Sequence, residues 1–382
     1  MPFEIQFDML PGGYAAESGR PGETLPVIVR EFTSSEDGNL FVSRLEGLPR
    51  DILNKLPNAS FHMEATTDHL FAIIRSDRTA TVYLNDLPHT LLIRAKRAIN
   101  AGDFVTLDHI LDVTKVKLTG ITVPPDAGVL AVFSSGWRKG FYFDLAPLFG
   151  PRSPRSYDLE SMLGQYYAYV NFQHYFSMTD AVWETFLRQG WFPFIHLHQS
   201  TLRTMIEWAK AGFVLDEQLD KIVVGLKDTV AGQIAGWKDR SRFVNHHELI
   251  TAAFRRFTED DFVSATAILF PRIEGILRAN HFAVPTTTKA SQVNLVASTF
   301  ERAHLPGHGN SLLLPERFRR YLTDVFFASF DPKNPVGLNR NTVAHGVAPQ
   351  DSFNRKAATV GFLILLQLAA LLPPDEKSPK TH

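Results

Sequence analysis

Short runs of β-branched and aromatic residues dominate the first 150 residues of the chain. They predict strands at 79–84, 90–96, 128–135 and 141–145, separated by glycine- and proline-containing turn signals. One short helix is expected at 106–113, where Thr106 is placed to cap its first turn. The pattern therefore indicates a β-rich N-terminal domain over residues 1–150.

Apolar residues recur at helical spacing from residue 158 onward. Asp351 or Ser352 is expected to cap the last, most apolar helix, and Pro271 is expected to kink an earlier one. We expect an α+β chain, in which the β-rich domain precedes a helical middle region (151–250) and a helical bundle (251–375). The predicted helices are 158–176, 179–190, 200–212, 215–238, 258–282, 314–330 and 357–372, with connections at 149–158 and 283–314.

Composition narrows the possible chemistry. The net charge of the 382-residue chain is −1, so any site for a polyanion must be local. The absence of cysteine excludes disulfides, thiolate zinc sites and cysteine nucleophiles, and it fits a reducing cytoplasm. The N-terminus lacks the pattern of a signal peptide. The longest apolar run, 357–372, is short for a membrane span and contains Gln367, so we expect a buried helix, no membrane association and a cytoplasmic protein.

The stretch GLNRNTVAHGV, residues 337–347, concentrates polar chemistry directly before that apolar run. Pro335 and Gly337 are expected to close a turn, and Asn339 or Asn341 to cap a short helix of about two turns. Gly346 can end this helix in a left-handed conformation. Asn341 and His345 are four residues apart, which predicts that they share a helix face.

Arginine, asparagine and histidine at this spacing suit phosphodiester chemistry. Arg340 offers a charged fork for a phosphate, and His345 can transfer a proton near neutral pH. RNA carries its own nucleophile, the 2′-OH, so its cleavage needs only proton transfer and charge stabilisation. The alternative is structural: an asparagine cap, an arginine paired with a carboxylate and a histidine satisfied in the core.

The same residues resemble the HEPN superfamily, whose motif is Arg, four to six residues, then His. Arg340 and His345 have four residues between them, Asn341 occupies the usual polar position, and LNRNTVAHG is similar to the RN…HG form of bacterial members. The helix FPRIEGILR, 270–278, resembles their first long helix and carries Glu274. The resemblance covers about residues 250–373, and the long segment 283–314 departs from minimal members.

The resemblance implies a HEPN-like bundle that dimerises, and an endoribonuclease that needs no metal or cofactor. His345 would be the general acid and base, Arg340 would stabilise the pentavalent phosphate, Asn341 would orient them, and Glu274 would hold Arg340 or His345. RNA and a second copy of the chain are the expected partners. Family members act in toxin–antitoxin systems and phage defence, which leaves an antitoxin or defence partner possible. Other members are inactive, so the alternative is a non-catalytic module for dimerisation or for binding a ligand or nucleic acid.

Two further features bear on partners. Phe326 and Phe327 are adjacent in the aromatic helix 318–330, and this apolar excess is expected to line a dimer seam unless the middle helices cover it. His196 and His198 lie two residues apart and would share a strand face, but no third ligand nearby completes a metal site. No metal site is therefore predicted.

Overall fold

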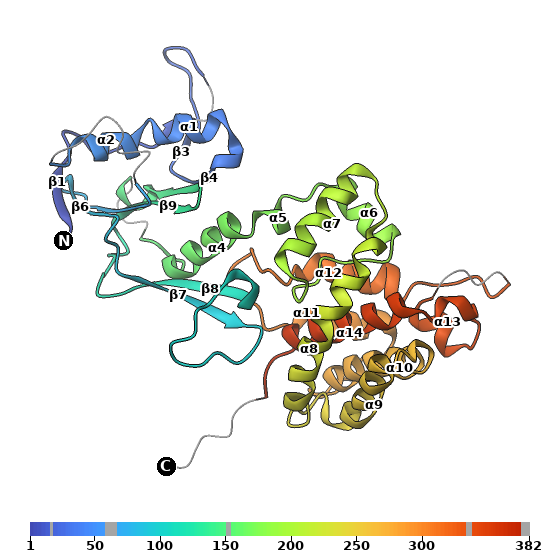
Figure 1. Cartoon of the computed structure of the whole chain (residues 1–382). Helices are drawn as coiled ribbons and strands as arrows, with labels where there is room; N and C mark the ends of the chain where they lie inside the picture. The colour runs from blue at the N-terminus through green and yellow to red at the C-terminus, as the bar shows by residue number, and fades with distance from the viewer. Residues whose placement is uncertain (16–17, 58–66, 150–153, 334–337, 376–382) are drawn as a thin grey trace, which may run out of the picture. The chain divides into compact units, whose positions relative to one another are not determined.

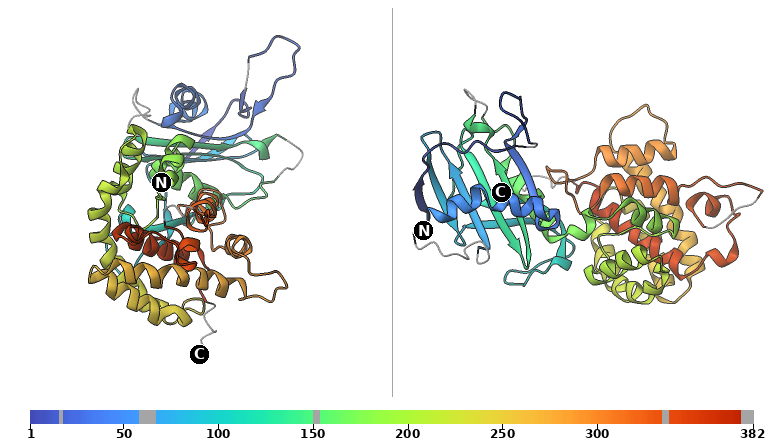
Figure 2. Two further views of the ribbon diagram at one scale, coloured as in Figure 1. Left: turned by 90° about the vertical axis from the view of Figure 1, so that its right-hand side faces the viewer. Right: turned by 90° about the horizontal axis from the view of Figure 1, so that it is seen from above.

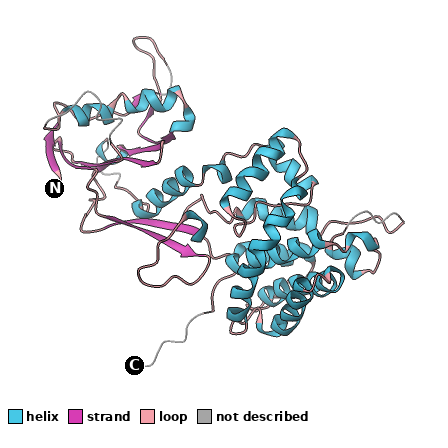
Figure 3. Ribbon diagram, viewed as in Figure 1, coloured by secondary structure: helices cyan, strands magenta, loops and turns pink. Residues whose placement is uncertain are grey.

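The computed structural model describes residues 1–15, 18–57, 67–149, 154–333 and 338–375. The chain forms two compact units: unit 1 comprises 1–92, 113–173 and 307–310, and unit 2 comprises 93–112, 174–306 and 311–382. In Figure 3 the strands, in magenta, precede α4 (Leu159–Asn171), and helices make up the chain from α4 onward. This arrangement confirms the α+β class with a β-rich N-terminal part.

Unit 1 is built on a six-stranded antiparallel sheet in the order β1-β6-β5-β9-β10-β4. Alternate residues of β5 face opposite sides of this sheet, as the pleat requires. Leu70, Ala72 and Ile74 join the cluster that includes α1 (Asn39–Leu45) and α2 (Leu48–Asn54), whereas Phe71 and Ile73 join the cluster that includes α4. Figure 2 shows α1 and α2 alongside the sheet. The strands are β1 (Phe3–Gln6), β6 (Thr79–Leu84), β5 (His69–Ile74), β9 (Gly128–Ser135), β10 (Arg138–Asp144) and β4 (Arg30–Ser34).

The predicted helix at 106–113 is wrong. A 3-10 turn, Leu107–His109, follows Thr106, and strand β8 (Ile110–Leu118) then pairs with β7 (His89–Ala95). Thr106 does cap the turn. The sequence of β8, ILDVTKVKL, is rich in β-branched residues, and pairing with β7 satisfies its backbone where an isolated helical turn would not. The small pair of β2 (Tyr14–Ala15) and β3 (Val27–Ile28) completes the described strands.

The two units do not divide at the expected domain boundaries. Helix α4 lies beyond residue 150 but packs against the sheet of unit 1 through Leu159, Leu163 and Val170. Residues 93–112, expected in the N-terminal domain, belong to unit 2. Residues 174–250 of the expected middle region (151–250) and the expected bundle (251–375) form one unit, apart from 307–310. Sheet packing and helix packing therefore set the division, and the Pro-rich connection at 149–158 does not.

Unit 2 packs its helices around α14 (Arg355–Leu371), whose residues 358–368 are all buried. A Cβ built on Gly361 would lie 2.5 Å from Leu269 Cδ2, so glycine allows α14 and α10 to cross closely. The buried Gln367 accepts a hydrogen bond from Ile195 N and donates one to Leu313 O. The other helices that follow α4 are labelled in Figure 1: α5 (Gln173–Phe176), α6 (Asp180–Arg188), α7 (Gln199–Ala211), α8 (Leu219–Trp237), α9 (His247–Thr258), α10 (Phe262–His281), α11 (Gln292–Glu301), α12 (Pro315–Tyr321) and α13 (Arg340–Ala344).

Three local expectations in unit 2 need correction. The last helix is capped by Asn354, which accepts from Ala357 N, and not by Asp351 or Ser352. The segment 283–314, expected to be rich in loop, contains α11, capped by Ser291. The helix expected over 314–330 consists of α12 followed by a π-helical turn, Leu322–Phe326.

The aromatic excess of this segment is covered within the chain. Phe326 and Phe327 are both buried, and the Phe326 ring lies 5.2 Å from the ring of Phe270 on α10. The expectation that these two rings line a dimer seam is therefore wrong.

Within the described parts of the chain, none of the helices combines the length and apolarity that a membrane span requires, and the apolar run 357–372 is the buried core helix that was expected.

Candidate functional site

Helix α13 carries the Arg340–His345 motif and is held at both ends. Asn339 is its N-cap: its side chain accepts from Asn341 N and Thr342 N, and Thr342 Oγ1 accepts from Asn339 N in return. Gly346 follows with φ 68°, the left-handed conformation expected of it. The helix covers five residues and ends at Ala344, shorter than the two turns expected. The predicted turn at Pro335 and Gly337 lies outside the described residues.

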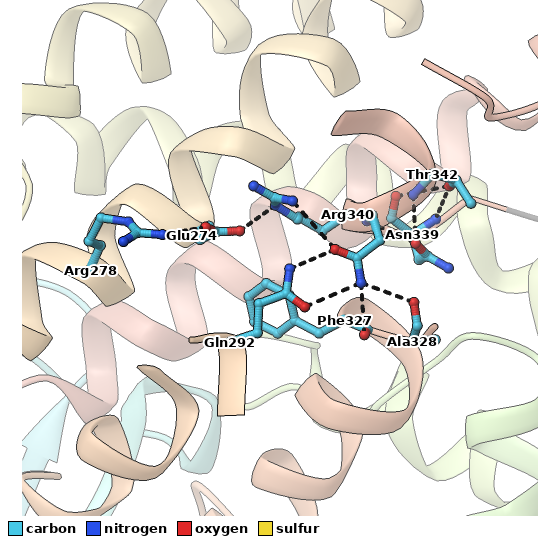
Figure 4. A network of polar contacts seen from close by, with 9 residues as sticks. Glu274, Arg278, Gln292, Phe327, Ala328, Asn339, Arg340 and Thr342 are labelled. Carbon is cyan, nitrogen blue, oxygen red and sulfur yellow. Dashed lines mark hydrogen bonds and ion pairs between the residues drawn. The ribbon is translucent and has the colours of Figure 1, made fainter. Parts of the chain in front are cut away.

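A buried glutamate on α10 fixes the arginine of the motif. Glu274 Oε2 forms an ion pair with Arg340 Nε, and Glu274 Oε1 accepts from Arg278 Nη2 at 3.0 Å. Figure 4 shows Glu274 between the two guanidinium groups. The Arg340 side chain keeps 21% of its surface exposed, so the guanidinium is oriented by the protein without being removed from solvent. Of the two partners expected for Glu274, Arg340 or His345, the ion pair is with Arg340.

The amide of Asn341 points inward and joins three segments. It donates to the backbone oxygens of Phe327 at 3.1 Å and Ala328 at 3.2 Å, and it exchanges hydrogen bonds with the Gln292 side chain at the start of α11. Its Oδ1 also accepts a weak hydrogen bond from Arg340 Nη1 at 3.4 Å. Figure 4 draws this network. Since both polar atoms of its side chain form hydrogen bonds, Asn341 anchors α13. Its contact with Arg340 is limited to the weak hydrogen bond from Nη1.

His345 lies outside this network. It is the C-cap residue of α13 and is exposed, and its ring is 5.5 Å from the ring of Phe330. Its imidazole makes no hydrogen bond or ion pair to another residue in the described part of the chain. The helix ends before it, so the expectation of one face shared with Asn341 does not hold: one side chain is turned inward and the other is exposed. The imidazole is thus accessible to a ligand, whereas a core histidine would be satisfied within the protein.

Sequence reasoning missed two members of the network, Arg278 and Gln292. Arg278 is one helical turn after Glu274, a spacing that predicts an ion pair. Gln292 lies in a segment that was expected to be loop, and only the capping serine at 291 signalled a helix there. A nearby cavity of about 230 Å³ is lined by Leu338 and Asn339 at the start of α13, but neither Arg340 nor His345 lines it.

The histidines considered for metal binding are in a different part of unit 2. His198 Nε2 contacts Asp108 Oδ2 at 3.0 Å, and its Nδ1 contacts Ser200 Oγ. Burial and the nearby Lys96 charge lower the pKa of His196 to about 3. Across the described residues, no three His, Cys, Asp or Glu side chains are grouped to hold a metal ion.

Comparison of the chain with protein-family models, with curated proteins and with solved structures found no match.

Proposed function

We propose that unit 2 is an endoribonuclease of the HEPN type that cleaves RNA without a metal ion, at a site to which two copies of the chain contribute. The observation that carries the proposal is the contrast within α13. Arg340 is oriented by a buried carboxylate, whereas His345, five residues on, is exposed and makes no hydrogen bond or ion pair to another described residue. A side chain that neither packs in the core nor forms an ion pair is available for proton transfer.

His345 would act as the proton carrier of the reaction. A general base takes the proton of the 2′-OH, the 2′-oxygen attacks phosphorus, and the bond to the 5′-oxygen breaks as a general acid protonates it. The products are a 2′,3′-cyclic phosphate and a 5′-hydroxyl, and no water, metal or oxidant is consumed. The two proton transfers occur on opposite sides of the phosphate, so two histidines from two copies serve them better than one.

Arg340 would stabilise the charge that develops on the phosphate. Glu274 carries one negative charge and the two arginines around it carry one positive charge each, which leaves a net charge of +1. The carboxylate fixes the direction of the Arg340 fork without cancelling the attraction for a phosphate. In this proposal Glu274 and Asn341 are positioning residues: one holds the guanidinium, and the other holds the helix.

The proposed activity predicts cleavage in the absence of divalent cations. Full-length protein incubated with mixed RNAs and EDTA should yield fragments that end in 2′,3′-cyclic phosphate, because the 2′-OH is the nucleophile. End-group analysis of the fragments checks this result. An RNA in which 2′-deoxynucleotides replace every ribose is the control and should stay intact. Fragments with 3′-hydroxyl ends, or cleavage that requires added Mg²⁺, would contradict the mechanism.

The two-copy site predicts a homodimer. Light scattering at micromolar concentration should give a mass of about 86 kDa, twice the 42.9 kDa chain. A two-fold contact is self-complementary, so one surface next to α13 can serve both chains. A protein that stays monomeric while cleaving RNA would show that one chain supplies the whole site.

The second candidate is a non-catalytic module that dimerises or binds a ligand or nucleic acid. It is favoured by the use of Arg340 and Asn341 in internal contacts, which a purely structural role also explains. RNA that binds without being cleaved would favour this candidate.

For either function we propose a cytoplasmic protein, in line with the cysteine-free chain, and a role in toxin–antitoxin pairing or phage defence, in line with the resemblance of the motif.

A further inference from the structure

A second candidate site lies within unit 2, in a cavity of about 600 Å³. Its walls are the segment 96–98 after β7, the 3-10 turn before β8, residues 196–198 before α7, one face of α8, and Leu363 of α14. None of the lining residues belongs to α10, α11 or α13, which hold the Arg340 network. The volume falls in the range of pockets that hold small organic ligands.

Positive charges outnumber negative charges around this cavity. Lys96, Arg97 and Lys221 line it together with Asp108 and Asp228, so three positive charges face two negative ones. Asp108 is already engaged, because it accepts from Gln199 N at 2.8 Å and contacts His198. Arg97 Nη1 lies 3.9 Å from Oδ2 of Asp103, a residue that does not line the cavity. The Lys96 ammonium makes no hydrogen bond or ion pair to any described residue.

Lys96 is held in a setting that is costly for a charge. Burial lowers its pKa to about 8, although the nearby Asp108 opposes the shift. Next to it, burial and the Lys96 charge keep the His196 imidazole neutral at physiological pH. A desolvated cation beside a neutral imidazole is stabilised by an anion that enters the cavity.

Helix α8 contributes a face with two glycines. Gly225, Thr229 and Gly232 line the cavity at spacings of four and three, hence on one side of the helix. A Cβ built on either glycine meets no atom within 4 Å, so packing in this structure does not require glycine there. Glycine lowers the stability of a helix relative to alanine. Both glycines have open space next to them, on the side of the helix that lines the cavity. Leu197, Ile222, Leu226 and Leu363 supply apolar lining.

We propose that this cavity binds a small organic anion, with its phosphate or carboxylate on Lys96 and its ring against the glycine face of α8. The unpaired cation accounts for the anionic head, and the open helix face with apolar neighbours accounts for the ring. The cavity and α13 are both in unit 2, so the ligand is an effector or a second substrate of that unit. The proposal does not depend on the ribonuclease activity.

Calorimetry on the full-length chain tests the proposal with four probes. AMP carries a phosphate and indole-3-acetate a carboxylate, and adenosine and indole are their neutral counterparts. One of the two anions should bind once per chain, and its neutral counterpart should bind at least about tenfold more weakly, since it lacks the charge-assisted contact. Which anion binds distinguishes a phosphate from a carboxylate ligand.

Two matched pairs of variants assign binding to the cavity. Lys96→Met should weaken binding at least about tenfold, whereas Lys238→Met, at an exposed lysine just after α8, should leave it unchanged. Gly232→Leu should also weaken it by filling the open face. Gly236→Leu is the control, because Gly236 is on the same helix with equal space but does not line the cavity. Neither leucine should lower the thermal unfolding midpoint, so a loss of binding is not a loss of folding.

Affinity should fall about tenfold between pH 7 and pH 9. The anion binds the protonated amine, and a pKa of about 8 leaves roughly a tenth of Lys96 charged at pH 9. The other charged and titratable groups that face the cavity are Arg97, Lys221, Asp108, Asp228, His109, His196 and His198.

The cavity assignment is overturned if neither anion binds at about 1 mM, the weak limit of specific affinity, or if Lys96→Met binds as well as the unmodified chain. AMP is also an RNA fragment, so His345→Ala is measured in parallel and should leave AMP affinity unchanged. A loss of AMP binding in that variant would move the ligand to α13 and overturn the cavity assignment. A chain that binds the anion but does not cleave RNA would support the cavity site. The same result would contradict the ribonuclease proposal and leave the cavity proposal intact.

Discussion

Replacing His345 with alanine should lower the rate of RNA cleavage by about 100- to 10,000-fold, the range that a positioned general acid or base contributes. The imidazole is exposed at the end of α13 and makes no hydrogen bond or ion pair to another described residue, so its removal takes away proton transfer and one ring contact with Phe330. The rate should be measured with a single RNA in EDTA, under conditions where the fragments with cyclic phosphate ends accumulate linearly.

His304→Ala is the matched control for this variant. His304 is also an exposed histidine of unit 2, and no hydrogen bond of its ring is found among the described residues. Both variants should keep their free energy of unfolding within about 0.5 kcal/mol of the unmodified chain, as surface substitutions do. Equal cleavage by the unmodified protein and His345→Ala would remove His345 from the mechanism.

Asn341→Leu should lower the free energy of unfolding of unit 2 by about 2–3 kcal/mol. Leucine has a similar size but leaves the Gln292 amide and the carbonyls of Phe327 and Ala328 without their partner, and a polar group that loses its partner inside a protein costs about 1–3 kcal/mol. Urea unfolding followed by tryptophan fluorescence reports mainly on unit 2, because four of the five tryptophans, 183, 191, 208 and 237, belong to it.

Asn245→Leu provides the comparison. Asn245 is exposed in a short 3-10 turn before α9, so the same substitution there should change the stability by no more than about 0.5 kcal/mol. If Asn341→Leu is as stable as this control, the inward amide does not anchor α13. The cleavage assay then adds a second reading: a stable Asn341→Leu chain that has lost activity would place Asn341 in contact with RNA.

Local sequence signals predicted the elements that depend on neighbouring residues. Strand β6 matches its predicted range of 79–84, and β9 matches 128–135. Thr179 caps α6 with its side chain, and Gly212 ends α7 in a left-handed conformation. These signals are reliable because a cap or a turn is satisfied within three or four residues, so its energy is independent of the rest of the fold.

The sequence also located the chemistry of the candidate site, but not its geometry. The spacing of Arg340 and His345 and the polar residue between them were visible in one line of sequence. Asn341 was one of two candidates to cap α13. It is Asn339 that caps α13, and Asn341 is turned toward α11, 49 residues earlier in the chain.

Contacts between distant segments were decided by the tertiary structure alone. Segment 110–118 is a strand because β7 offers its backbone a partner, a condition that no local pattern contains. Glu274 and Arg340, 66 positions apart, meet because α10 and α13 pack against each other in unit 2. The exposure of His345 and the isolation of Lys96 have the same origin: burial and charge pairing depend on which surfaces meet, and a single sequence records only which residues are available.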